Sequence, residues 1–431
     1  MSSILFTNVD ILIRDSQKYN TIHGYLGVEG NVIDYIGNEK PNKGYDIIKD
    51  YSGKLLMPGL INCHTHCPMV FMRGKGSGLN LQQWLFDTIF PIEDKMTADI
   101  VNKSSKFALL EMIASGTTSF TDMYFFPEET AEAVKESGMK ANICKYITCF
   151  DENMKVEDSL IPASIEFFKQ FNGYGDGRVI VDFGIHGEYT NKAHIVKAYS
   201  EFAKQYHANI NIHLSETFSE TQQCFDRYGL TPTQWFESLG TFDSPVTTAH
   251  CVAVTDQDMD ILKKHNVTVA HNPTSNMKLG SGFAPVKKML EKGINVTLGT
   301  DGAASNNNLN MFEEIHVASL ISNGYNYDPT EISATELIDM ATINGAIAQG
   351  RKDTGKIQVG YKADIIAIDM NKPHLMPNFD SEILLVSSVQ GSDVCMNMVD
   401  GSILYENGNY FTLDKEKITD DFLEVVNEFY K

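Results

Sequence analysis

Short runs of apolar, often β-branched residues alternate along most of this chain with longer segments of helical length. The longer segments include residues 128–137, 192–206, 256–265 and 283–292. The short runs are nearly continuous in hydrophobicity, which is typical of parallel strands that helices cover on both faces. We predict eight such strands, at residues 55–66, 117–123, 140–147, 179–187, 209–216, 246–252, 267–272 and 295–301. Eight successive strand–helix units predict a (β/α)₈ barrel, a fold of the α/β class.

The two ends of the chain show a different pattern, in which polar and apolar positions alternate and glycines recur. Residues 1–54 and residues 358–431 both have the alternation of short antiparallel strands. Neither piece is large enough for a core of its own. We therefore predict that both ends together build one small composite β-sandwich domain, beside a barrel domain of residues 55–357. The last segment, residues 419–430, has the spacing of an amphipathic helix.

Residues that can bind a metal ion come at the ends of several predicted strands. His64 and His66 end the first strand, and side chains two positions apart lie on the same face of a strand, so both imidazoles point together. Three more such residues end the fifth, sixth and eighth strands: His213, His250 and Asp301. Active sites of (β/α)₈ barrels lie at the C-terminal ends of the strands, so these side chains are expected to converge. Together with Glu216, three residues past His213, they predict a hydrolytic site around a single metal ion.

The chain is strongly acidic, with 56 Asp and Glu against 35 Lys and Arg and a net charge of −21. Such a field repels phosphate backbones and anionic lipids, so we expect neither nucleic acid nor a membrane as a partner. A neutral, zwitterionic or cationic small molecule fits the charge better, although solubility alone explains it equally well. No run approaches the roughly 18 apolar residues of a membrane span, and the start lacks the basic and apolar regions of a secretion signal. We expect a cytoplasmic protein and leave its oligomeric state open, a homo-oligomer included.

Five motifs follow one another along the chain: His64-Thr65-His66-Cys67-Pro68-Met69, His213-Leu214-Ser215-Glu216, Ala249-His250-Cys251-Val252, His271-Asn272-Pro273-Thr274-Ser275-Asn276 and Gly299-Thr300-Asp301-Gly302. In this order they resemble the amidohydrolase superfamily. Within it the chain is most similar to methylthioadenosine/S-adenosylhomocysteine deaminases and their chlorohydrolase-like relatives. The resemblance covers nearly the whole chain and is more specific for the superfamily than for the substrate.

The resemblance implies that one divalent ion, Zn²⁺, is held by four side chains: His64, His66, His213 and Asp301. Asp301 would also accept a proton from the attacking water. His250 would orient the attacking hydroxide, and Glu216 would protonate a ring nitrogen of the substrate and then help ammonia to depart. An ordinary histidine inside the barrel and a structural carboxylate are the alternatives for His250 and Glu216.

The same resemblance implies that Glu93 binds the ribose hydroxyls, that His186 contacts the nucleoside and that Trp84 packs against it. Lys145 stands where the family has an arginine on the third strand, and residues 151–158 offer no match for a second arginine. Lysine does not reproduce the bidentate grip of arginine on a carboxylate. A core tryptophan, a solvated glutamate and a hydrogen-bonded strand-end histidine or lysine are the alternatives for these four positions.

We predict a metal-dependent aminohydrolase that converts an adenine nucleoside into its inosine form with release of ammonia. The expected substrates are methylthioadenosine, 5′-deoxyadenosine, adenosine and S-adenosylhomocysteine, with those that carry an uncharged 5′ group at least as favoured as the last. The alternative is another hydrolase of the superfamily that acts on guanine, a triazine or another C–N bond. A non-enzymatic scaffold is expected to have lost a ligand or the acid, and none is missing.

Overall fold

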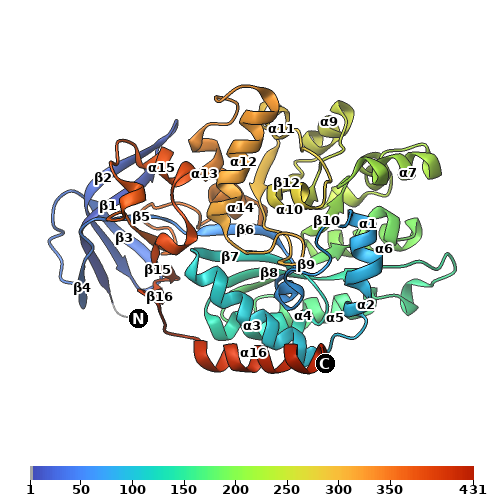
Figure 1. The fold of residues 1–431 in the computed structure, drawn as a ribbon, viewed down its shortest axis with the longest axis horizontal. Helices are drawn as coiled ribbons and strands as arrows, with labels where there is room; N and C mark the ends of the chain where they lie inside the picture. The colour runs from blue at the N-terminus through green and yellow to red at the C-terminus, as the bar shows by residue number, and fades with distance from the viewer. Residues whose placement is uncertain (1–2) are drawn as a thin grey trace.

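A computed structural model describes residues 3–431 and separates the chain into a barrel and a smaller domain that is built on a nine-stranded sheet (Figure 1). The barrel strands are parallel and follow one another in chain order: β6 (Leu60–Thr65), β7 (Thr117–Met123), β8 (Lys140–Ile147), β9 (Val179–Ile185), β10 (Ile210–Leu214), β11 (Val246–His250), β12 (Thr268–His271) and β13 (Asn295–Leu298). Every residue of β7, β10, β11 and β12 is buried. The α/β barrel predicted from the continuous apolar runs is confirmed.

Side-chain and backbone contacts connect the first barrel strand to the segment after the last. The Asn62 amide donates to Thr300 Oγ1 at 2.8 Å, and its Oδ1 accepts from the Thr300 N–H at 3.0 Å. Directly beside this pair, the Asp301 N–H donates to the carbonyl of His64 at 2.9 Å. Two residues that the sequence predicts as metal ligands are therefore neighbours at the place where the barrel closes.

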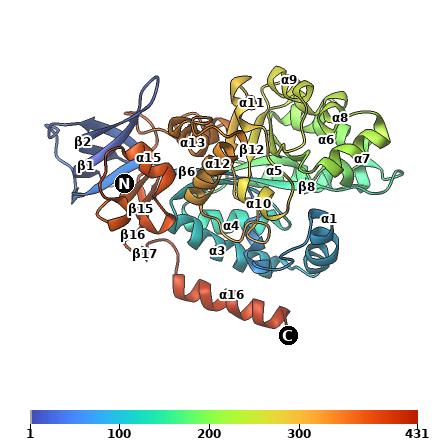
Figure 2. The same cartoon turned by 45° about the horizontal axis from the view of Figure 1, so that its top comes forward.

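Helices follow the strands and cover the outside of the barrel (Figure 2). Those between β6 and β9 are α1 (Leu81–Gln83), a π-helical turn η2 (Trp84–Ile89), α2 (Phe90–Glu93), α3 (Ala98–Ala114), α4 (Pro127–Ser137) and α5 (Ile161–Phe171). Those after β9 are α6 (Ala193–Tyr206), α7 (Phe218–Tyr228), α8 (Pro232–Ser238), α9 (Asp256–Lys264), α10 (Pro273–Lys278), α11 (Val286–Glu291), α12 (Met311–Asn326), α13 (Ala334–Ala341) and α14 (Ile343–Ala348).

Both chain ends contribute to one β domain, as predicted, and its strands form one mixed sheet. Its strands are β1 (Ile4–Arg14), β2 (Tyr19–Glu29), β3 (Val32–Gly37), β4 (Ile47–Asp50), β5 (Lys54–Pro58), β14 (Ile365–Asp369), β15 (Val394–Val399), β16 (Ser402–Glu406) and β17 (Asn409–Tyr410). Strand β5 pairs with β1 on one side and with β14 on the other, so it joins the two chain ends. Helix α15 (Ser381–Ser387) lies between β14 and β15 in the chain.

The prediction of one strand over residues 55–66 is wrong, because this run is two strands in two different sheets. Strand β5 belongs to the small sheet and β6 to the barrel, with Gly59 between them. The Gly59 N–H donates to the Asp364 carbonyl, and a Cβ at this position would come within 2.2 Å of Thr118. A continuous apolar run cannot show this change of sheet, because both strands are buried.

Several barrel strands end one to three residues before the predicted position. The predicted ends at residues 187, 216, 252, 272 and 301 become Ile185, Leu214, His250, His271 and Leu298. The chain leaves the strand direction through left-handed residues such as Ser215 and Cys251. The polar residues in question therefore lie at the strand ends or in the first turns beyond them.

The C-terminal helix α16 (Lys415–Phe429) extends the predicted helix at its start and lies along α3 (Figures 1 and 2). The rings of Phe107 and Phe422 stack there with centroids 4.1 Å apart. Within residues 3–431, no helix combines the length and the apolar character needed to cross a membrane.

Candidate active site

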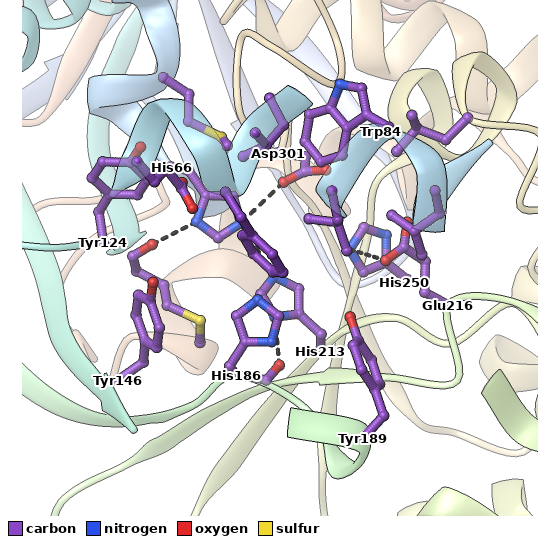
Figure 3. A pocket seen from close by; sticks show the side chains of 18 residues that line it. His66, Trp84, Tyr124, Tyr146, His186, Tyr189, His213, Glu216, His250 and Asp301 are labelled. Atoms are coloured by element: carbon purple, nitrogen blue, oxygen red, sulfur yellow. Dashed lines mark hydrogen bonds and ion pairs between the residues drawn. The ribbon is translucent and has the colours of Figure 1, made fainter. Parts of the chain in front are cut away.

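Five potential metal ligands converge at the C-terminal end of the barrel, and Figure 3 labels His66, His213, His250 and Asp301 among them. Ligating atoms lie within 4.8 Å of one another in two overlapping groups: His64, His66 and Asp301, and His64, His213 and His250. His66 Nε2 and His213 Nε2, which come from different strands, are 3.1 Å apart. The convergence predicted from the strand ends is thus present, and the cluster fits a metal site.

Hydrogen bonds on the far side of the rings fix which nitrogen faces the cluster. His66 Nδ1 donates to the Met123 carbonyl at 2.5 Å, and His213 Nδ1 donates to the His186 carbonyl at 2.6 Å. A carbonyl can only accept, so each Nδ1 carries a proton, and in the neutral form of each ring Nε2 presents a lone pair to the cluster. His64 Nε2 is buried and has no hydrogen-bond partner among the described residues. A cation at this point would give all three lone pairs a partner.

Asp301 completes the cluster as a buried, ionised carboxylate. Its Oδ1 lies 3.5 Å from His64 Nε2 and 3.3 Å from His66 Nε2. Its Oδ2 accepts from the hydroxyls of Ser275 and Ser305, both at 2.7 Å. Burial alone would raise the pKa of Asp301, but the His64 and His66 rings beside it hold this pKa well below its usual range.

Strained backbone accompanies these side chains. Ser215, His250, Cys251 and Asp301 all have positive φ, between 48° and 74°. A left-handed residue other than glycine costs on the order of 1–3 kcal/mol, and such residues persist where the surroundings enforce them. Strain at three strand ends indicates that folding stability is given up here to aim side chains into one point.

Glu216 and His250 lie side by side next to the cluster. Glu216 Oε2 is 3.7 Å from His250 Nε2, and Ser281 Oγ donates to Glu216 Oε1 at 3.4 Å. Burial raises the pKa of Glu216, against the lowering effect of His250. His250 Nδ1 donates to Asn276 Oδ1 at 2.9 Å, so the Nε2 of the neutral ring is an acceptor. The pair offers a carboxyl that keeps its proton at higher pH than usual beside a base of fixed orientation.

The cluster opens into a cavity whose empty space, including part of its mouth, is about 520 Å³. Figure 3 shows Tyr124 and Tyr146 on one side and Glu216 and His250 on the other. Most of the wall is apolar or aromatic, and the remaining lining residues are four histidines and three carboxyl side chains, Glu93, Glu216 and Asp301. Neither lysine nor arginine is among the lining residues in the described part of the chain. A substrate with a planar, uncharged ring system suits such a wall, whereas an anionic group would meet no lysine or arginine side chain.

Three of the predicted substrate contacts line this cavity: Trp84, Glu93 and His186. Trp84 is buried in η2, and its Nε1 has no hydrogen-bond partner within residues 3–431. Burial raises the pKa of Glu93 to about 7, although a hydrogen bond from Tyr124 opposes the shift. Burial lowers the pKa of His186 to about 3, so this ring is neutral near pH 7.

Lys145 is the predicted contact that the structure does not bring to the cavity. Its ammonium pairs with Glu128 of α4 at 3.1 Å, and Lys145 is not one of the lining residues. Side chains alternate along β8, and the neighbouring Tyr146 points inward instead. The expectation that Lys145 contacts the substrate therefore has no support from the position of its side chain.

Comparison with known proteins agrees with this geometry. Residues 55–404 match the model of the amidohydrolase family. The chain belongs to the amidohydrolase family. It is 43% identical over 418 residues to a 5-methylthioadenosine/S-adenosylhomocysteine deaminase of Caldanaerobacter subterraneus, with 96% of each chain covered. It is 42% identical to a 5′-deoxyadenosine deaminase of Methanosarcina acetivorans, with 98% of this chain and 97% of that protein covered.

A solved structure of an adenosine deaminase from Xanthomonas campestris with bound zinc has the same fold as this amidohydrolase. Its TM-score is 0.92 at 25% sequence identity, over 99% of this chain and 98% of that one. The predicted membership of the superfamily is therefore confirmed.

Sequence reasoning missed several residues of the amidohydrolase site. Tyr124, Tyr146 and Tyr189 line the cavity, and no sequence motif indicated them. Each lies in or just after a predicted strand–loop junction, so the sequence predicts that it is near the end of a strand. The direction of a side chain just past a strand end depends on the turn, which the sequence pattern does not predict. Ser275 and Asn276 belong to one of the five motifs, yet their contacts with Asp301 and His250 appear only in three dimensions.

Proposed function

We propose that this amidohydrolase is a zinc-dependent deaminase of adenine nucleosides. The observation that carries the proposal is the adjacency of Glu216 and His250 to the donor cluster, inside a cavity without lysine or arginine. A metal site alone would serve many hydrolyses. A carboxyl with a raised pKa beside it adds the acid that an amino-substituted heterocycle needs, because attack on such a ring places charge on the neighbouring nitrogen.

Four residues would hold the metal ion: His64, His66, His213 and Asp301. Three imidazoles and one carboxylate are donors that suit one Zn²⁺ and leave a position for water. The chemistry that such an ion supplies when bound is the acidification of a water, whose pKa falls from about 15.7 to about 7. Two observations support this use of the cluster. His64 Nε2 has no hydrogen-bond partner within residues 3–431, and His66 Nε2 and His213 Nε2 lie 3.1 Å apart.

The protein groups then divide the proton transfers. Asp301 is ionised and two serines hold its Oδ2, so Oδ1 can take the proton of the attacking water. His250 Nε2, an acceptor in the neutral ring, orients the hydroxide toward the ring carbon. Glu216 gives its proton to the adjacent ring nitrogen. The proton that Asp301 took from the water passes to the amino group, which leaves as ammonia, and Glu216 supports this departure by taking the proton of the new hydroxyl group. A positioned acid of this kind accelerates a reaction by about 10²–10⁴-fold.

The remaining cavity residues fit a nucleoside. Glu93, ionised above about pH 7, would accept hydrogen bonds from the ribose hydroxyls. The neutral His186 would contact the sugar, and Trp84 would pack against the nucleoside. The absence of lysine and arginine from the lining of the described cavity favours uncharged 5′ groups, as in methylthioadenosine, 5′-deoxyadenosine and adenosine, over the amino-acid tail of S-adenosylhomocysteine.

The test is ultraviolet monitoring of the metal-loaded protein with these four nucleosides, with guanine and a triazine as competing substrates and ammonia release as a second readout. We expect conversion of adenine to hypoxanthine nucleosides, with the three uncharged compounds at least equal to S-adenosylhomocysteine in kcat/KM. Chelation should abolish the activity and Zn²⁺ should restore it. No spectral change with any nucleoside, together with turnover of guanine or a triazine, would replace the proposal with the rival hydrolase.

A further inference from the structure

A second buried glutamate holds the turn that carries Glu216. The N–H of Ser215 donates to Glu220 Oε1 at 3.0 Å, and the N–H of Glu216 donates to Glu220 Oε2 at 2.8 Å. Both oxygens of one carboxylate are therefore engaged by two successive backbone groups. Glu220 is only 6% exposed, so solvent does not compete for these bonds.

The Glu216 side chain is held much more loosely than its backbone. Its carboxylate has one side-chain hydrogen bond, from Ser281 at 3.4 Å, and lies 3.7 Å from His250. Weak tethers suit a group that must release and recover a proton. They also mean that the direction of this side chain is set mainly by the backbone from which it projects.

That backbone is strained where Glu220 binds it. Ser215 has φ of 48°, which non-glycine residues adopt only when the surroundings enforce it. The Ala253 N–H also donates to the Ser215 carbonyl at 2.8 Å, so the turn is held from the neighbouring strand end as well. Two independent contacts on one strained residue fix the chain between His213 and Glu216.

An ordinary helix cap does not account for this arrangement. Glu220 is the third residue of α7, whose N-cap is Thr217. In a capping box the third residue binds the N–H of the N-cap itself, as Glu336 binds Ser333 at the start of α13. Glu220 instead reaches past its N-cap, to the residue of the proposed acid and the one before it.

We propose that Glu220 is a positioning residue, which aims the side chain of Glu216 at the substrate by binding the backbone N–H groups of residues 215 and 216. The inference rests on the proposed function, since it assigns Glu216 as the acid. Glu220 itself touches neither substrate nor metal in this role. Its loss should weaken proton transfer while leaving the substrate cavity and the donor cluster in place.

The decisive variant is Glu220→Gln, which keeps the shape but replaces one acceptor oxygen by an amide that cannot accept an N–H. We expect kcat to fall about 10–100-fold, within the contribution of a positioned acid, and KM to change less than about threefold.

The matched control is Thr217→Ala, which removes the Thr217 Oγ1 cap on the Glu220 N–H at 3.1 Å but leaves the Glu220 carboxylate in place. It weakens the start of the same helix, so a merely structural role predicts equal loss in both variants. We expect this control to keep both kcat and KM within about threefold of wild type. Glu336→Gln tests the same substitution in a true capping box far from the cavity.

Glu220→Asp covers the case in which the glutamine variant does not fold. It keeps the charge but is one methylene too short to reach both N–H groups, so kcat should again fall by more than threefold. Failure of the wild-type enzyme on every nucleoside would contradict the proposed function. The positioning role would be overturned if the wild type is active and every folded Glu220 variant keeps more than a third of the wild-type kcat. It would also be overturned if Thr217→Ala loses as much kcat as the Glu220 variants do.

Discussion

The two ends of the barrel both bury charged side chains, but they treat them in opposite ways. At the N-terminal end, Lys140 donates to both oxygens of Asp364 at 2.9 and 2.7 Å and lies 2.8 Å from Asp400. At the same end the Arg351 guanidinium donates to two backbone carbonyls, at 2.7 and 3.0 Å. These charges are largely matched by fixed partners.

At the C-terminal end several buried polar groups have fewer hydrogen-bond partners than they are able to bind. His64 Nε2 has no partner within residues 3–431, Glu216 has one long hydrogen bond, and burial raises the pKa of Glu93 to about 7. An unmatched buried polar group costs about 1–3 kcal/mol. Buried charges that are fully paired hold parts of a fold together. Buried charged and polar groups that lack partners and face one cavity provide a reaction centre. The following changes test this difference, beginning with the largest expected effect.

Glu216→Gln should lower kcat by about 10²–10⁴-fold, because the amide has no proton to give to the ring nitrogen. The metal content should equal that of wild type, since Glu216 lies outside the proposed donor set of four. Steady-state kinetics and elemental analysis of the same preparation measure both. A variant within fivefold of wild type would remove Glu216 from the chemistry, and one that lost its metal would make Glu216 a ligand.

Lys140→Met at the opposite end should affect stability rather than turnover. It leaves Asp364 and Asp400 buried without their cation, and breaking a buried pair in this way costs about 3–5 kcal/mol. Urea unfolding measures the loss, while kcat per folded molecule should stay within about twofold. Lys103→Met, which breaks a partly exposed helix pair with Asp99, should cost less than about 1 kcal/mol. A large fall in kcat for folded Lys140→Met would end the distinction between the two barrel ends.

The C-terminal end was the more predictable of the two from sequence. His64 and His66 share a face because strand side chains repeat every two residues, and barrel topology gathers strand ends that lie far apart in the chain. Both arguments need only the local pattern and the fold class. The Lys140 network needs the contact between the barrel and the small sheet, and Asp364 lies 224 residues away in a segment predicted only as strand and turn.

The same limit explains the individual errors. Gly59 follows one strand and precedes another, but an apolar run on both sides hides the change of sheet. Lys145 and Tyr146 are adjacent on β8, so an error of one position in the facing of the strand exchanges an outward lysine for an inward tyrosine. Glu220 follows one of the five motifs, but its partners depend on a strained turn that no periodicity indicates.

Ser305→Ala should have a smaller effect than Glu216→Gln or Lys140→Met, and this effect should be on metal affinity. The variant removes only one of the two hydroxyls that bind Asp301 Oδ2. Outer hydrogen bonds of this kind are typically worth about 10–100-fold in metal affinity or activity. We expect the dissociation constant for Zn²⁺, measured by chelator competition, to rise within that range, and Ser275→Ala to do the same. Ser137→Ala, a buried serine bonded to the Val134 carbonyl, is the control and should leave metal affinity unchanged. Equal affinities in all three variants would mean that the serines do not support the ligand.

The smallest expected effect is a pH dependence of the Michaelis constant that originates at Glu93. Its pKa is raised to about 7, so in the free enzyme the carboxyl is protonated below that pH and ionised above it. The ionised form is the better acceptor for two ribose hydroxyls, and about one tenth of the molecules are ionised one unit below the pKa. The Michaelis constant for adenosine should therefore rise about tenfold between about pH 8 and pH 6.

A dideoxy analogue of adenosine that lacks both of these hydroxyls should show a constant value over the same range. Glu93→Gln should bind adenosine more weakly at every pH and lose this pH dependence. If the Michaelis constants of adenosine and its dideoxy analogue depend on pH in the same way, the titrating group does not act on the ribose hydroxyls. Glu93 would then have no role in substrate binding.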